Sequence, residues 1–118
     1  MPGDTNDLSD VFVHDLQTGR TSRVSVDSTG VQGNRDSYDS SLSSDGRYIA
    51  FESDATNLLP GDTNGSTDVF IYDRQTGQTS RVSVDAAGVQ GNSGCFSPSI
   101  SGNGRYVAFH SLATNLVP

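Results

Sequence analysis

Short clusters of apolar residues recur along the chain, separated by polar stretches rich in Gly, Asn, Asp and Ser. Some clusters, such as residues 48–51, are apolar at consecutive positions, which is typical of strands covered on both faces. Others, such as residues 21–27, alternate apolar and polar side chains, which favours an outer strand with one solvated face. No window shows helical periodicity, so the pattern predicts an all-β protein.

The turn residues place the strands more closely. Gly46 in the Ser44-Asp45-Gly46 segment and Gly104 in Gly102-Asn103-Gly104 fit tight turns, because glycine readily supplies a positive φ angle. Longer polar loops are expected at residues 28–39 and 54–67. The predicted strands are residues 10–15, 21–27, 40–43, 47–53, 68–73, 79–85, 97–101 and 105–111.

The chain repeats itself with a period of 58 residues, and residues 3–60 match residues 61–118 at 36 positions. The segment at 21–27 recurs unchanged at 79–85. Repeats of this kind are typical of solenoids, propellers and arrays. With four antiparallel strands in each repeat, and strands covered on both faces, we expect β-propeller blades. The alternative is an eight-stranded sandwich or barrel, but a blade-like unit that recurs whole favours the propeller.

Residues 97–109, with the sequence Ser-Pro-Ser-Ile-Ser-Gly-Asn-Gly-Arg-Tyr-Val-Ala-Phe, and the Asp-Val-Phe-Ile-Tyr-Asp strand at 68–73 resemble the WD40-like Pro-Asp repeats of the TolB type. The resemblance covers both repeats. It implies that residues 40–43 and 97–101 lie nearest a central channel, and residues 21–27 and 79–85 at the rim. In this chain, Ser44 and Gly102 replace the proline of the family turn, and the loop between the second and third strands is longer.

Read in this order, the single domain of residues 1–118 contains two strands of one blade, a complete blade at about 40–85, and two strands of another. Open edges are expected along residues 10–15 and 105–111, and exposed edges promote association. The half blades of successive chains could pair head to tail and close a ring. We expect a trimer with six blades, as in the TolB type, with an eight-bladed tetramer next and an open filament as a further alternative. The cut within a blade also suggests an excised or engineered fragment of a longer propeller.

Composition narrows the range of partners. The net charge of −7, from 14 acidic and 7 basic residues, argues against binding to nucleic acid or to an anionic membrane. We expect neither a signal peptide nor a transmembrane segment in this chain. The single Cys95 forms no internal disulfide and implies no redox compartment. The localisation is left open, although members of the family it resembles are often periplasmic or secreted.

The loop before the third strand of each blade, that is, before residues 10–15 and 68–73, carries oxygen ligands at spacings that could surround Ca²⁺. Leu8 stands where the other copy has a serine, and the bidentate Glu of an EF-hand is missing. The alternative is that these side chains cap turns through local backbone amides. The candidate metal ligands are Asp4, Asn6 and Asp10 in the first copy, and Asp62, Asn64, Ser66 and Asp68 in the second.

The other long loop could bind a carbohydrate or another small ligand. Its amides could hydrogen-bond to hydroxyl groups, and an aromatic side chain near its end could stack on a sugar. The alternative is that these residues satisfy the loop backbone. The candidate ligand-binding residues are Gln32, Asn34 and Tyr38, with Gln90, Asn92 and Phe96 in the second copy.

The sequence offers little for catalysis. His14 and His110 match Tyr72 and Glu52 in the other repeat, and no phosphate loop, nucleophile elbow or zinc motif is present. The recurring arginines are expected to form ion pairs or hydrogen bonds between strands. We therefore expect a non-enzymatic propeller scaffold that assembles with itself. The alternative is a carbohydrate- or small-ligand-binding propeller, assisted by Ca²⁺, with one site per repeat.

Overall fold

The computed structural model describes residues 7–59 and 66–117. Regular structure in these ranges is entirely β, with eight strands and no helix, which confirms the all-β prediction. No helix in this part of the chain is long and apolar enough to cross a membrane. The strands are β1 (Phe12–His14), β2 (Thr21–Arg23), β3 (Ser37–Leu42), β4 (Tyr48–Ser53), β5 (Asp68–Asp73), β6 (Gln78–Arg81), β7 (Cys95–Ile100) and β8 (Val107–Ser111).

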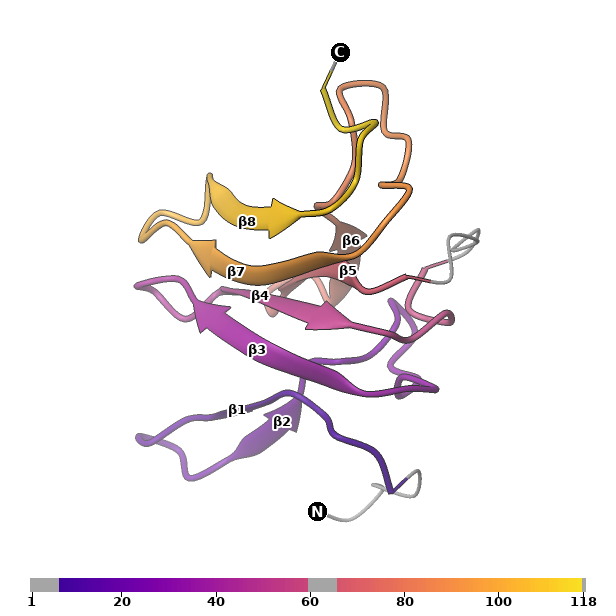
Figure 1. Ribbon diagram of the computed structural model, residues 1–118. Helices are drawn as coiled ribbons and strands as arrows, with labels where there is room; N and C mark the ends of the chain where they lie inside the picture. The colour runs from indigo at the N-terminus through magenta and orange to yellow at the C-terminus, as the bar shows by residue number, and fades with distance from the viewer. Residues whose placement is uncertain (1–6, 60–65, 118) are drawn as a thin grey trace.

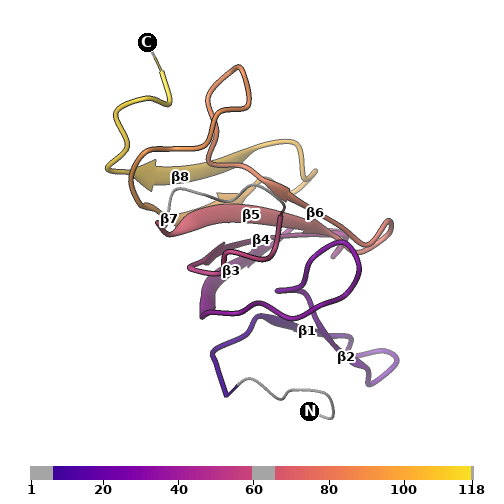
Figure 2. The same cartoon turned by 90° about the vertical axis from the view of Figure 1, so that its right-hand side faces the viewer.

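The described strands form three antiparallel sheets (Figure 1). The middle sheet has four strands in the order β3-β4-β5-β6, whereas β1-β2 and β7-β8 form two-stranded sheets. The sheets are layered, with β1-β2 and β7-β8 on opposite sides of the middle sheet, and the view from the side keeps this order (Figure 2). The division into half, whole and half sheets that the repeat predicts is therefore present in the strand pairing.

The central strands β4 and β5 are apolar on both faces, and both faces are covered. Ile49, Phe51 and Phe70 are fully buried or nearly so. The rings of Phe51 and Phe70 stack with centroids 5.8 Å apart across the β4–β5 pair. Together with Val11 and Val24, these side chains form the core between the β1-β2 sheet and the middle sheet. Burial of such side chains contributes about 1.5–3 kcal/mol each.

The predicted outer strand at residues 21–27 is too long. β2 ends at Arg23, and the next three residues, Val24, Ser25 and Val26, are all buried. The Ser25 hydroxyl accepts a hydrogen bond from Val11 N at 3.1 Å, in place of a backbone carbonyl. The second repeat has the same arrangement, since Val69 N donates to Ser83 Oγ and β6 ends at Arg81. A serine side chain therefore ends the ladder where the alternation alone predicts that it continues.

The first strand of the middle sheet, β3, begins earlier than predicted. β3 starts at Ser37 within the expected loop, because Ser37 pairs with Ser53 at the end of β4. The register then shifts between Tyr38 and Ser41, and Asp39 takes a φ of 52° at this bulge. β7 repeats the shift between Phe96 and Ser99. The polar residues that suggest a loop are therefore part of a bulged strand.

Candidate functional site

Two sheet edges of the described chain are open although their counterparts in the repeat are paired. β1 pairs only with β2, and β8 pairs only with β7. Their counterparts in the repeat, β5 and β4, pair with each other in the middle sheet. An unpaired strand edge presents backbone donors and acceptors to any other strand that fits. Both edges lie where the sequence predicts them.

Side chains on the two edges are more exposed than their counterparts in the middle sheet. Phe12 on β1 has 38% of its surface exposed, whereas Phe70 on β5 has 0%. Likewise, Phe109 on β8 is half-buried, whereas Phe51 on β4 is fully buried. The equivalent phenylalanines are thus buried in the middle sheet and at least partly exposed in the two-stranded sheets at the ends of the stack.

An ion pair marks the register of the β4–β5 ladder. The Arg47 guanidinium donates to both carboxylate oxygens of Asp73, from Nε and Nη2, each at 2.9 Å. This pairing holds the pKa of Asp73 well below its usual range and raises that of Arg47. The counterparts are Arg105, next to β8, and Asp15, next to β1. They stand at the two open edges, and Arg105 is exposed.

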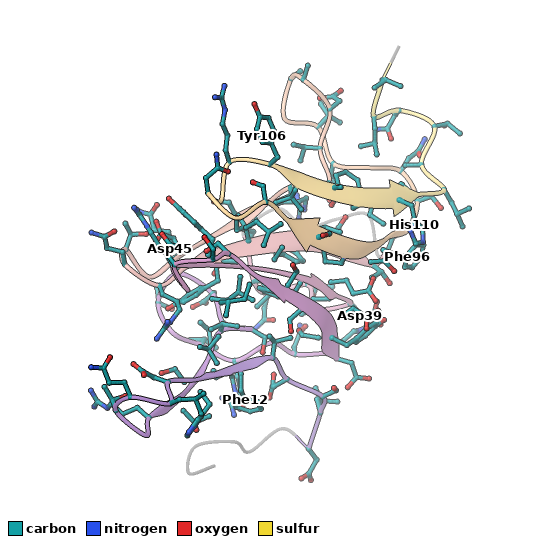
Figure 3. The ribbon with its side chains drawn as sticks, turned by 90° about the vertical axis from the view of Figure 1, so that its left-hand side faces the viewer. Phe12, Asp39, Asp45, Phe96, Tyr106 and His110 are labelled. Atoms are coloured by element: carbon teal, nitrogen blue, oxygen red, sulfur yellow. The ribbon has the colours of Figure 1, made fainter. Side chains whose placement is uncertain are left out.

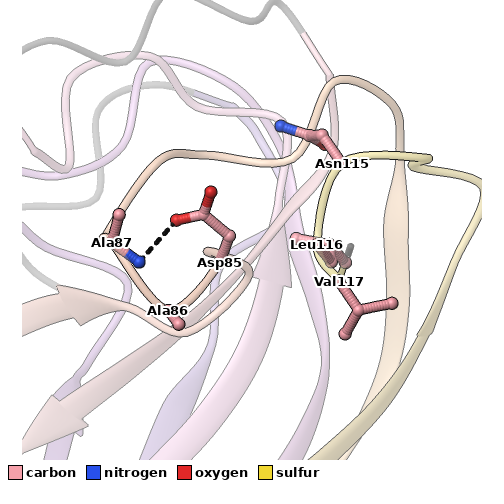
Figure 4. Close-up of a pocket in the computed structure, with 6 residues that line it drawn as sticks. All are labelled: Asp85, Ala86, Ala87, Asn115, Leu116 and Val117. Carbon is pink, nitrogen blue, oxygen red and sulfur yellow. Dashed lines mark hydrogen bonds between the residues drawn. The ribbon is translucent and has the colours of Figure 1, made fainter.

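Two of the surface hollows in the described part of the chain lie beside the half sheets. One lies between β1 and the middle sheet and is lined by Phe12, Val13, Leu42 and Ile49, together with His14, Ser40 and Ser41. The other lies near the C-terminal end of the described chain (Figure 4). Its lining residues are Asp85, Ala86, Ala87, Asn115, Leu116 and Val117. Leu42 and Val117 are more than half exposed, so both hollows present apolar surface to solvent.

Most of the predicted metal ligands lie outside the described residues. Asp4, Asn6, Asp62 and Asn64 lie outside the described residues. Asp10 accepts a hydrogen bond from Ser25 Oγ at 2.9 Å and lies 3.3 Å from Arg23 Nε. Asp68 has the same neighbours in the second repeat, Ser83 Oγ at 3.1 Å and Arg81 Nε at 3.6 Å. These contacts tie the start of β1 to β2 and β5 to β6, so both carboxylates have a structural role.

Ser66 is half-buried at the start of the second described range. Within residues 7–59 and 66–117, no group of three or more His, Cys, Asp or Glu side chains is placed to hold a metal ion. The Ca²⁺ site stays a prediction, since four of its seven residues lie outside these ranges.

The predicted ligand-binding amides cross-link two loops of their own repeat. Asn34 N donates to Asn57 Oδ1 at 2.9 Å, and Thr56 N donates to Asn34 Oδ1 at 2.9 Å. Asn57 Nδ2 donates to the Gln32 carbonyl at 2.9 Å. The second repeat has the same bonds among Asn92, Thr114, Asn115 and the Gln90 carbonyl. The repeated asparagines thus satisfy loop backbone, and ligand binding at these residues stays a prediction.

The two aromatic candidates lie on β3 and β7. The Tyr38 hydroxyl donates to Asp54 Oδ2 at 3.2 Å, and burial together with the Asp54 charge raises the pKa of Tyr38. Phe96 lies against His110 on the neighbouring strand, with ring centroids 5.7 Å apart. Tyr38 and Phe96 hold equivalent positions of the repeat. Neither takes part in the hydrogen bonds between the loop asparagines described above.

The sequence analysis missed Glu52 as a notable residue. This side chain lies on β4 and is only 3% exposed. Burial and a hydrogen bond with Asp39 raise the pKa of Glu52 to about 7, and Asp54 adds a further negative charge. Its position directly after the apolar run at residues 48–51 is the sequence signal, because a carboxyl group at a covered position requires a partner.

The sequence matches no protein-family model, and no curated protein shows significant similarity to it.

Proposed function

We propose that the chain is a non-enzymatic β-propeller scaffold that assembles head to tail with copies of itself into a closed ring. The observation that carries the proposal is the pairing of β4 with β5 in the middle sheet, while their repeat counterparts β8 and β1 remain apart at the open edges. β8 of one chain would pair with β1 of the next. Each junction would then complete a four-stranded blade from two half sheets.

The repeat supplies a register for this junction. Replacing each β4 residue by the residue 58 positions later, and each β5 residue by the residue 58 positions earlier, gives the expected partners on β8 and β1. In that register the buried pair of Phe51 and Phe70 becomes Phe109 facing the partner's Phe12. The other pairs are Tyr106 with Asp15, Val107 with His14, Ala108 with Val13, His110 with Val11, and Ser111 with Asp10, the second residue of each pair belonging to the next chain.

Charge complementarity supports the same register. Arg47 pairs with Asp73 within the middle sheet, so Arg105 of one chain would pair with the partner's Asp15. Arg105 lies over the ring of Tyr106, with its guanidinium carbon 5.2 Å from the ring centroid, as Arg47 lies over Tyr48 at 4.8 Å. The Arg105 guanidinium thus lies over the neighbouring ring at a distance similar to that of Arg47 in the complete sheet.

The two hollows fit strands of neighbouring chains. The hollow at Phe12, Leu42 and Ile49 would receive the partner's β7 and β8, because β7 packs against the middle sheet at the equivalent place within one chain. For the second hollow, Thr79 of β6 donates through Oγ1 to the Val26 carbonyl at 2.6 Å. Its counterpart, the partner's Thr21, would approach the Val84 carbonyl beside Asp85 and Ala86 (Figure 4).

Each chain would contribute two blades to the ring. Propellers commonly have four to eight blades. Three chains would give six blades, which we favour, and four would give eight. A heterologous junction of this kind makes a ring when its rotation closes, and an open filament when it does not.

Disulfide trapping tests the junction. The Tyr48 carbonyl accepts from Ser43 N, just after β3, so Ala50, two residues on, also directs its backbone groups away from β5. Ala108 and the partner's Val13 would therefore form a non-hydrogen-bonded pair, with Cα atoms about 4.5 Å apart and within disulfide reach. We expect Ala108→Cys with Val13→Cys, in a Cys95→Ser background, to give one discrete covalent ring on oxidation.

The matched control is Tyr106→Cys with Val13→Cys, which places the thiols two residues out of register. It should cross-link much more slowly. If neither double variant cross-links, or if both do so equally, the proposed junction is wrong.

A further inference from the structure

A tyrosine of the middle sheet packs directly on a glycine turn of the next sheet in the stack. A Cβ atom at Gly104 would lie 2.3 Å from Cδ2 and 2.7 Å from Cε2 of Tyr48. Non-bonded carbon atoms do not approach so closely, so the turn between β7 and β8 accepts the Tyr48 ring only because residue 104 is a glycine. The contact therefore seats the start of β4 against the turn of the sheet that follows.

Both members of this contact have counterparts that lie open in the single chain. Tyr106 holds the position of Tyr48, and 62% of its surface is exposed. Figure 3 shows the Tyr106 side chain directed away from the middle sheet. Gly46 holds the position of Gly104, with φ angles of 73° and 74°. Beyond its chain neighbours, the only described atom within 4 Å of a Cβ at Gly46 would be Arg74 Nη1, at 3.6 Å.

We propose that Tyr106 of one chain packs on the partner's Gly46 and forms a second docking contact at each junction, apart from the β8–β1 edge. The inference rests on the proposed ring, in which β7-β8 of one chain and β1-β2 of the next make the sheet that precedes the next chain's middle sheet. Tyr48 reaches from its own sheet to the sheet that follows, so Tyr106 would reach to the partner's middle sheet. The Gly46 turn is thus occupied by a second copy of this chain.

The faces of the middle sheet agree with this direction. Along β4, Tyr48 shares a face with Glu52, whose Oε2 accepts from Ser97 N on β7 at 3.0 Å. This face therefore meets β7-β8 of the same chain. The opposite face carries Phe51, which packs in one cluster with Val11 just before β1. The preceding chain's β7-β8 would extend that cover toward the Gly46 turn, with Tyr106 pointing at it.

A hydrogen bond between successive sheets repeats the relationship. Ser41 Oγ accepts from Ile100 N on β7 at 3.1 Å. The counterparts are Ser99 and Leu42, and both are exposed. Ser43 N donates to the carbonyl of the first β4 residue, so the N–H of Leu42, one residue earlier, points away from β4. The Ser99 hydroxyl would accept from that N–H of the partner, so the second contact also keeps its chemistry across the repeat.

NMR detects the contact through the glycine Hα protons, because an aromatic ring shifts the resonances of protons that touch it. The Hα signals of Gly104 should be displaced by Tyr48 already in a monomer blocked by Ala108→Glu, a change at an exposed side chain. The Hα signals of Gly46 should be ordinary in that monomer and should move in the same direction as those of Gly104 on assembly. Tyr106→Ala should remove this shift from Gly46 and leave Gly104 unchanged.

A steric variant tests the contact by association. Gly46→Asn keeps the turn, because asparagine tolerates a positive φ, but its side chain would occupy the place of the partner's Tyr106. We expect association to be about tenfold weaker per junction, as overpacking typically causes. Gly19→Asn is the matched control. Gly19 has a φ of 74° and no described atom beyond its chain neighbours within 4 Å of the Cβ position, and its counterpart Gly77 meets only Tyr72 Oη, at 3.9 Å.

Tyr106→Ala completes a double-mutant cycle. It removes the ring that the asparagine would displace, so Gly46→Asn with Tyr106→Ala should assemble more tightly than the sum of the single changes predicts. If Gly46→Asn assembles like the parent, if it loses no more affinity than Gly19→Asn, or if the Gly46 signals do not move on assembly, the contact is wrong and the β8–β1 junction stands. A parent chain that stays monomeric overturns the ring and the contact together.

Discussion

Ala108 on β8 is exposed, whereas Ala50, which holds the same position of the repeat on β4, is fully buried. The single chain therefore tolerates a charged side chain at residue 108, but a completed blade would bury it. We expect Ala108→Glu to leave the melting temperature of the monomer nearly unchanged and to weaken assembly by at least 3 kcal/mol, about the cost of burying an unpaired charge. Analytical ultracentrifugation measures both the mass and the dissociation constant.

Ser22→Glu is the matched control for that substitution. Ser22 lies on β2 and is exposed, and its counterpart Ser80 in the complete sheet is exposed as well. This variant should assemble like the parent chain. Equal loss of assembly in both variants would point to a general effect of added negative charge and not to the proposed junction.

The proposed pair of Arg105 and the partner's Asp15 can be isolated by a double-mutant cycle. Asp15→Asn is the suitable partial change, because Asp15 Oδ1 also accepts from Gln17 N at 2.8 Å in the turn after β1. We expect Arg105→Gln and Asp15→Asn to weaken assembly non-additively, with a coupling energy of about 1 kcal/mol. Simple additivity of the two changes would show that these side chains do not meet.

The asparagine cross-links should contribute to folding in both repeats. Asn34→Ala removes the acceptor for Thr56 N and the donor at Nδ2 that bonds Thr56 Oγ1 at 2.8 Å. A loss of about 1–2 kcal/mol in the free energy of unfolding is expected from these hydrogen bonds. Asn92→Ala should give a similar loss, since it breaks the equivalent bonds with Thr114. Unchanged denaturation midpoints in both variants would contradict the structural role.

Glu52 should make the stability of the single chain fall as the pH rises. Its pKa is raised to about 7 in the folded chain and is near 4.5 when exposed, so the folded state binds more protons between these values. Glu52→Gln in the monomeric Ala108→Glu background should therefore flatten the pH profile and stabilise the chain at pH 8 by about 1–3 kcal/mol. Urea denaturation at pH 5 and pH 8 measures this difference. A variant that is no more stable than its parent at pH 8 would refute a buried, repelled carboxylate.

The repeat and the apolar clusters were enough to locate all the described strands and the two open edges. β5 (Asp68–Asp73) even has the predicted bounds. β4 and β5 are the most readable strands because both carry consecutive apolar residues, and β4 follows a turn at Gly46, which has a φ of 73°. The half-sheet arrangement could be predicted because it follows from the position of the repeat, and not from fine detail of packing.

Features that depend on side chains bonding to distant backbone could not be read in this way. β2 and β6 end earlier than predicted because the Ser25 and Ser83 hydroxyls accept hydrogen bonds from Val11 N and Val69 N. The bulge at Asp39 is hidden in a run of polar residues that looks like a loop. The candidate amides such as Asn34 were noted from their chemistry, but only the structure shows which groups they bond.

The mass of the assembled particle tests the central claim most directly. Native mass spectrometry and light scattering should be run at low micromolar and higher concentrations. Head-to-tail closure predicts one discrete species at a whole multiple of the 12.4 kDa chain, three chains being the expected number. A stable 12.4 kDa monomer across that range, or a continuous distribution of filaments, would contradict the closed ring.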